Sequence, residues 1–144
     1  MYVLEQDLVD DFVNKLPFSP FATKEQTYFL TEFNYFRGRT DIVVLGQDNV
    51  IFAFEAKLKN WRKALNQAFR NTCFANFSYI LVPESVAKYA EKYYEEFLKR
   101  SVGICYISNG EIMISYEAKH NKPIQDYLYE RVKLSILEGE INAR

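Results

Sequence analysis

Two acidic residues and one lysine, Asp41, Glu55 and Lys57, have the types and spacing that could do chemistry. Asp41 lies in an apolar run over 40–45, and Glu55 and Lys57 end a second apolar run over 50–57. Strand interiors disfavour charged residues, so their presence in these runs suggests a functional site. Two carboxylates that meet would suit a hard cation such as Mg²⁺ or Mn²⁺, which prefers oxygen ligands. A cation beside a phosphodiester would activate water, and Lys57 could orient or activate that attacking water.

The turn between the two runs decides whether these side chains meet. If the turn is centred on Asp48, the antiparallel register sets Asp41 directly opposite Glu55. Opposed residues of this kind have Cβ atoms about 4.5–5.5 Å apart. Lys57 would share a face with Glu55, because side chains alternate along a strand. A two-residue turn would shift the register and separate the two acids.

Further oxygen ligands are predicted near this pair. The main-chain carbonyl of Ala56 lies at the end of the same strand as Glu55. If Phe36 pairs with Arg39 across a turn at Gly38, Glu32 shares a face with Asp41 and is an additional expected metal ligand. Three acids of the first predicted helix compete with Glu32 for that role: Glu5, Asp10 and Asp11.

Periodicity along the chain predicts a single domain over 1–144 with the element order αβββαβαββα, which is an α/β mixed sheet with helices against it. Asn60 is the expected N-cap of the helix that follows the second apolar run. Asn109-Gly110 predicts a tight hairpin near the C-terminal end of the sheet. The predicted helices cover 4–16, 60–73, 83–100 and 123–137, with a frayed tail from Glu138, and the predicted strands cover 28–36, 40–45, 50–57, 78–82, 102–107 and 111–116.

Asp41, then Glu55-Ala56-Lys57 at the end of a strand, then a helix bearing Gln67, resembles the PD-(D/E)XK nuclease superfamily. The resemblance covers Leu4 to about Val82 in element order. It implies an αβββαβ restriction-endonuclease-like core in which the two acids bind Mg²⁺ or Mn²⁺ and the lysine is catalytic, with the C-terminal β-hairpin and helix as additions. It also implies that Gln67 supports the site or touches nucleic acid. Thr40 stands where the family often has proline, a departure that touches no ligand.

A local basic surface is predicted on the helix after Lys57. Lys63, Gln67, Arg70 and Asn71 share one stripe at spacings of three and four residues, away from the apolar stripe. With the neighbouring loop, this is the densest basic stretch in the chain. The residues expected to contact phosphates are Lys59, Arg62, Lys63 and Arg70.

Composition narrows the classes of protein and site. The chain of 144 residues is 49% hydrophobic with a formal net charge of −1, so we expect a folded domain without a global basic field. A single histidine and two cysteines exclude multi-histidine sites and ordinary structural zinc sites, so any metal must be held mainly by oxygen. The sequence has no basic leader followed by an apolar run and no run long enough to span a membrane, so we expect a cytoplasmic protein.

These features predict a metal-dependent nuclease that hydrolyses phosphodiester bonds in DNA. The size also resembles Holliday-junction resolvases, which act as dimers, so a homodimer is one expected state. Two alternatives remain open at this stage. One is a non-catalytic nucleic-acid-binding or assembly module that keeps the nuclease fold, and the other is a structural α/β domain with a fortuitous charge cluster.

Overall fold

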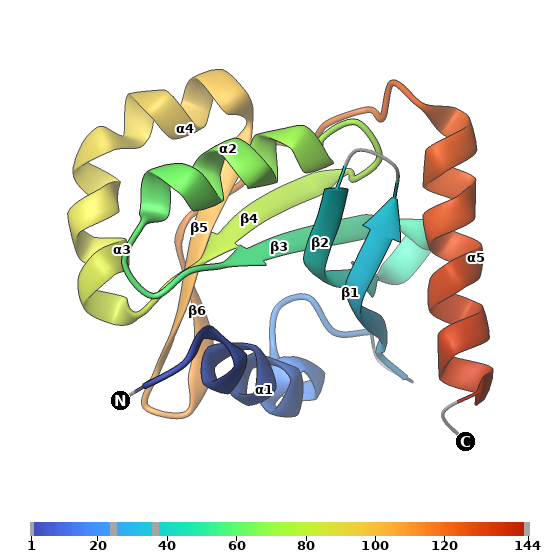
Figure 1. Ribbon diagram of the computed structural model, residues 1–144, viewed down its shortest axis with the longest axis horizontal. Helices are drawn as coiled ribbons and strands as arrows, with labels where there is room; N and C mark the ends of the chain where they lie inside the picture. Colours follow the sequence, from blue (N-terminus) through green and yellow to red (C-terminus); the bar gives the residue numbers. More distant parts are fainter. Residues whose placement is uncertain (1, 24–25, 36–37, 143–144) are drawn as a thin grey trace.

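Six strands form one mixed sheet, in which they lie side by side in the order they occur along the chain (Figure 1). The computed structural model describes residues 2–23, 26–35 and 38–142. The α/β class, the mixed sheet and the C-terminal helix are as predicted. The strands are β1 (Tyr28–Tyr35), β2 (Gly38–Leu45), β3 (Ile51–Ala56), β4 (Phe77–Leu81), β5 (Val102–Ser108) and β6 (Glu111–Tyr116).

Strand direction changes twice across the sheet. β1, β2 and β3 form an antiparallel meander, β3, β4 and β5 are parallel, and β6 returns antiparallel to β5. The parallel neighbours are joined by helical crossovers, as parallel pairing requires. The β5–β6 turn has positive φ at both Asn109 (52°) and Gly110 (77°), which confirms the predicted tight hairpin.

Helices cover both faces of the sheet. Figure 1 shows α1 on one side of the sheet and α2 on the other, with α5 alongside β1 and β2. Each helix buries an apolar stripe: α1 through Leu8 and Phe12, for example, and α5 through Leu128, Val132 and Ile136. The helices are α1 (Glu5–Lys15), α2 (Trp61–Asn71), α3 (Glu84–Ala90), α4 (Tyr94–Arg100) and α5 (Asp126–Asn142).

The β2–β3 hairpin has the register that the sequence predicts. Leu45 pairs with Ile51 and Val43 with Ala53, so the turn is centred on Asp48. Asp48 adopts a left-handed φ of 57°, and the Gly46 N–H donates to the Val50 carbonyl at 2.8 Å to close the turn. Both faces of this hairpin are buried, because α1 covers one face and α5 packs against the other.

The β1–β2 turn has the predicted length, with two residues between the paired ends, but it lies one residue earlier in the chain than predicted. Tyr35 pairs with Gly38 and Asn34 with Arg39, so the predicted pairing of Phe36 with Arg39 is wrong by two residues. Phe36 itself lies outside the described residues. Each β2 residue therefore faces a β1 residue two positions from the predicted one. Because side chains alternate along a strand, a shift of two residues leaves every β1 side chain on its predicted face.

Two helix predictions differ from the structure. The predicted helix over 83–100 is interrupted by a 3₁₀ turn at Glu91–Tyr93, which divides it into α3 and α4. The C-terminal helix begins at Asp126 rather than Pro123 and continues to Asn142, past the predicted end at Leu137. Its packing against β1 and β2 gives the helix a tertiary support that periodicity alone does not reveal.

Asn60 caps α2 as predicted, since its side-chain oxygen accepts from the Lys63 N–H at 3.1 Å. We expect Asn60→Ala to lower the free energy of unfolding by about 1 kcal/mol, because that N–H loses its partner. Urea unfolding followed by circular dichroism measures this change. Asn66→Ala is the matched control, because Asn66 is an exposed residue inside the same helix. An equal loss of stability in the two variants would contradict the cap.

Candidate active site

Asp41 and Glu55 lie where β2 and β3 part. The ladder between the two strands ends at the pair Ile42–Phe54, and Asp41 and Glu55 are the next residues on each strand. Beyond the last backbone pair, the Asp41 side chain binds the main chain of β3: its Oδ2 accepts from the Ala56 N–H at 2.9 Å. Its carboxylate therefore lies beside β3 and next to Glu55, with which it also interacts directly. The predicted meeting of the two acids is confirmed.

Glu55 is a buried carboxyl group. Only 1% of its surface is exposed. Burial and then the charge of the neighbouring Asp41 raise the pKa of Glu55 from 4.5 to about 8. The Asn71 side-chain amide opposes this shift by donating to Glu55 Oε2 at 2.7 Å. Two acids held together in this way share a proton at neutral pH unless a cation replaces it.

Asn71 connects Glu55 to a buried polar network. Its Oδ1 accepts from the hydroxyls of Thr40 at 2.9 Å and Tyr35 at 3.2 Å, while its amide nitrogen donates to Glu55. Arg70 donates in turn to the Tyr35 hydroxyl at 3.0 Å. Sequence reasoning placed Asn71 on the polar stripe of α2 and predicted no contact with Glu55. Its position one helical turn after Gln67 was the available signal.

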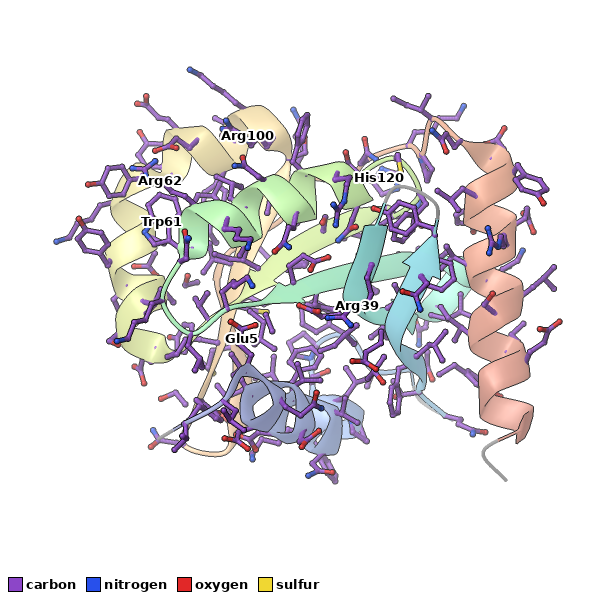
Figure 2. The ribbon with its side chains drawn as sticks, viewed as in Figure 1. Glu5, Arg39, Trp61, Arg62, Arg100 and His120 are labelled. Atoms are coloured by element: carbon purple, nitrogen blue, oxygen red, sulfur yellow. The ribbon has the colours of Figure 1, made fainter. Side chains whose placement is uncertain are left out.

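Lys57 follows β3, and its side chain points toward α1, whereas Glu55 is hydrogen-bonded to Asn71 of α2 on the other side of the sheet. The predicted shared face of Lys57 and Glu55 is therefore wrong. The Lys57 Nζ is 3.5 Å from Glu5 Oε1, and the Lys57 main-chain N–H donates to the Leu81 carbonyl at 3.1 Å. Figure 2 shows Glu5 on the side of α1 that faces the sheet. Glu5 is thus the acid of the first helix that reaches this site. Asp10 and Asp11 are engaged elsewhere, with Gln6 and with Tyr2 and Lys15 respectively.

A small cavity of about 140 Å³ opens beside Asp41, between α1 and the edge of the hairpin. Glu32 lines this cavity. Thr31 pairs with Ile42 and Phe33 with Thr40, so Glu32 lies opposite Asp41. Glu32 is exposed, has a left-handed φ of 55° and forms an ion pair with Arg39 at 3.6 Å. The cavity is lined by Glu5, Gln6, Val9, Thr31, Glu32, Arg39, Asp41 and Ala56.

The carboxylates do not form a preassembled metal cage. Within the described ranges, no three His, Cys, Asp or Glu side chains form a group that could hold a metal ion. Of the predicted metal ligands, the two carboxylates of Asp41 and Glu55 and the Ala56 main-chain carbonyl are left. This donor set fits Mg²⁺ or Mn²⁺, since Mg²⁺ is commonly held by one or two carboxylates and keeps several waters. Neither Glu32 nor Glu5 completes a group of three with the pair in this structure.

Gln67 lies on α2, one turn before Asn71. Its Oε1 is buried and has no hydrogen-bond partner in the part of the chain that the structure describes. An unpaired buried oxygen costs about 1–3 kcal/mol, so such atoms call for a partner such as water or a ligand. Gln67 therefore carries an unsatisfied acceptor on the same helix as Asn71, which binds Glu55.

The four predicted phosphate-binding residues fall into two groups. Arg62 donates to both carboxylate oxygens of Glu96, at 2.6 and 2.8 Å, and its guanidinium lies 4.3 Å from the centre of the Trp61 ring (Figure 2). Arg70 donates to Tyr35 and to the main-chain carbonyl of Arg39. Both arginines are thus held by intramolecular contacts, whereas Lys59 and Lys63 are exposed.

The fold and the carboxylate pair define an α/β protein with a buried acidic site at a strand junction. No family model matches the sequence, and no curated protein matches it. The structure is similar to that of a protein of unknown function from Silicibacter pomeroyi, with a TM-score of 0.57 and 16% sequence identity over 82% of this chain and 76% of the other. At this identity the similarity shows the fold alone. None of the helices in the described residues is long and apolar enough to cross a membrane.

The raised pKa of Glu55 makes stability depend on pH. Between pH 4.5 and about 8 the folded state holds a proton that the unfolded state has released. The free energy of unfolding should therefore fall as pH rises through this window, by at most about 1.4 kcal/mol per pH unit from this group. Urea unfolding across the window measures the slope, and Glu55→Gln should make it shallower.

Glu111→Gln is the control for this measurement, because Glu111 is an exposed acid at the start of β6. It should keep the slope of the unmodified protein. Equal slopes in the unmodified protein and Glu55→Gln would contradict the buried, proton-holding carboxyl.

Proposed function

We propose that this protein is a Mg²⁺- or Mn²⁺-dependent nuclease of the PD-(D/E)XK type that cleaves DNA. The observation that carries the proposal is the contact of Asp41 with Glu55 at the β2–β3 junction. Lys57 directly follows β3, the strand that carries Glu55. The element order from α1 to β4 agrees with the αβββαβ order of that superfamily. The match of site and element order supports an active enzyme of this class.

Asp41, Glu55 and the Ala56 carbonyl would hold the cation. When bound, it would supply Lewis-acid stabilisation of charge on the phosphate and a lowered pKa for the attacking water. Glu55 would lose its proton when the cation binds, because the two then compete for the same oxygens. Asn71 donates to Oε2 of Glu55, so the other carboxylate oxygen would remain available to the cation.

Lys57 would position the attacking water and balance charge on the phosphate. In the free protein its ammonium faces the Glu5 carboxylate at 3.5 Å, a distance at which the ion pair is loose. An incoming phosphate would replace Glu5 as the partner of Lys57. Gln67, with its unpaired buried oxygen, would support the site through a water or through the substrate.

DNA would approach over the start of α2. Lys59 and Lys63 are exposed there and available to phosphates, whereas Arg62 and Arg70 would have to leave Glu96 and Tyr35 to take part. Two exposed lysines make a small electrostatic surface, so we expect weak binding with a shallow salt dependence, because the slope of log K against log salt scales with the number of phosphates neutralised and would be only about −2.

The second candidate is a non-catalytic nucleic-acid-binding module that keeps the fold. It is favoured by the lack of a third acid at the Asp41–Glu55 pair among the described residues, and by the neutralisation of Lys57 by Glu5. Metal binding and cleavage separate the two functions.

Mn²⁺ should raise the melting temperature of the protein, because a ligand that binds the folded state alone stabilises it. The increase should grow as pH rises toward 8, since the cation must displace the proton of Glu55. Differential scanning fluorimetry at several pH values measures it. Asp41→Asn should abolish the increase, and Asp48→Asn, at the distant turn of the same hairpin, should retain it. An equal increase in Asp41→Asn would overturn the proposed metal site.

Purified protein should cleave DNA in Mn²⁺, and Lys57→Ala should lower the rate at least about a hundredfold, as expected for loss of an acid–base or water-positioning group. A panel of supercoiled, linear, single-stranded and branched DNA identifies the preferred substrate. Lys57→Ala should still bind Mn²⁺, while Lys59→Ala should retain the cleavage rate within a few-fold. Full activity in Lys57→Ala would refute the mechanism, and Mn²⁺ binding without cleavage of any substrate would favour the second candidate.

A further inference from the structure

The outer side of α5 carries exposed apolar residues as well as charges. Its inner side packs on β1 and β2, and in Figure 1 the other elements all lie to one side of this helix. On the outer side, Tyr127 is 82% exposed and Leu134 is 55% exposed. A helix with apolar residues on both sides is typical of one that is covered on both sides.

A shallow hollow follows this outer side. It has a volume of about 350 Å³ and is lined only by α5 residues, which include the apolar Leu134 and several polar or charged side chains. An apolar side chain from another molecule would fill such a hollow. Its lining residues are Tyr127, Glu130, Arg131, Leu134, Ser135 and Glu138.

The charged residues that line the hollow can pair with those of a second copy of the protein. Among the described residues, Glu130 already has an ion-pair partner, Lys133 at 3.0 Å, whereas neither Arg131 nor Glu138 has one. Arg131 and Glu138 flank Leu134 on the same stripe, three residues before it and four residues after it. If two copies of α5 lie antiparallel with the two-fold axis beside Leu134, each Arg131 faces the Glu138 of the other copy.

We propose that the protein forms a homodimer through the outer side of α5, with the two helices antiparallel. The contact consists of Leu134 packed against its counterpart at the centre and two symmetric ion pairs between Arg131 and Glu138 on either side. The inference goes beyond the proposed nuclease function and does not rest on it, because α5 contributes none of the candidate site residues.

The dimer should be weak. A helix of this length extends about 25 Å at 1.5 Å per residue, and a single helix pair buries less than the standard interface of about 1,600 Å². We expect a dissociation constant on the order of tens of micromolar. Sedimentation velocity over a wide range of protein concentrations measures the monomer–dimer equilibrium, and a monomer at every concentration would overturn the proposal.

Charge reversal tests the interface and its register. Arg131→Glu and Glu138→Arg should each raise the dissociation constant of the homodimer at least about tenfold, because both ion pairs become like-charge pairs. An equal mixture of the two variants should form a heterodimer, since every pair in it is again of opposite charge. Far-ultraviolet circular dichroism verifies that each variant is folded.

Lys99→Glu is the matched control, because Lys99 is an exposed cation on α4 away from this surface. It should retain the dissociation constant of the unmodified protein. A dimer that survives Arg131→Glu unchanged would overturn the α5 interface, and failure of the mixed variants to associate would overturn the antiparallel register.

Discussion

The site depends on keeping two carboxyl groups in contact where β2 and β3 part. Their repulsion and the burial of Glu55 both oppose ionisation, so the pair is stable at neutral pH only with a shared proton or a bound cation. The surrounding structure keeps it in place from three directions. The Ala56 N–H binds Asp41, the Asn71 amide binds Glu55, and the buried hydroxyls of Thr40 and Tyr35 fix Asn71. Few other arrangements of these strands would satisfy all of these groups.

The supporting network also explains why α2 carries buried polar residues. Its apolar stripe packs on the sheet through Trp61, Ala64, Leu65 and Ala68, as expected of an amphipathic helix. Asn71 continues inward at the C-terminal end of the same helix and is fully buried. A buried amide is tolerated there because both ends of it are hydrogen-bonded. The helix therefore contributes to both the core and the site.

Most of the hairpin that carries the site could be predicted from its sequence. Asp48 and Asn49 favour the left-handed conformation, so a turn centred on Asp48 could be anticipated, and the meeting of Asp41 with Glu55 followed from it. The β1–β2 register was missed because turns of equal length placed one residue apart along the chain are compatible with the same alternation of side chains. The ion pair of Lys57 with Glu5 and the role of Asn71 join elements distant in sequence, which periodicity within one element cannot reveal.

The order of the strands has a consequence for how the site is assembled. Every strand pairs with its neighbours in the sequence, and no later strand inserts between two earlier ones. The β2–β3 hairpin is a local structure that can form early in folding, since hairpins form within microseconds and their ends are close in the chain. In that hairpin alone Glu55 would be hydrated and ionised. Burial is the largest cause of the raised pKa of Glu55, so most of its affinity for a proton develops when α2 docks and excludes water. The protonation of one carboxyl group therefore depends on the completion of the core around it.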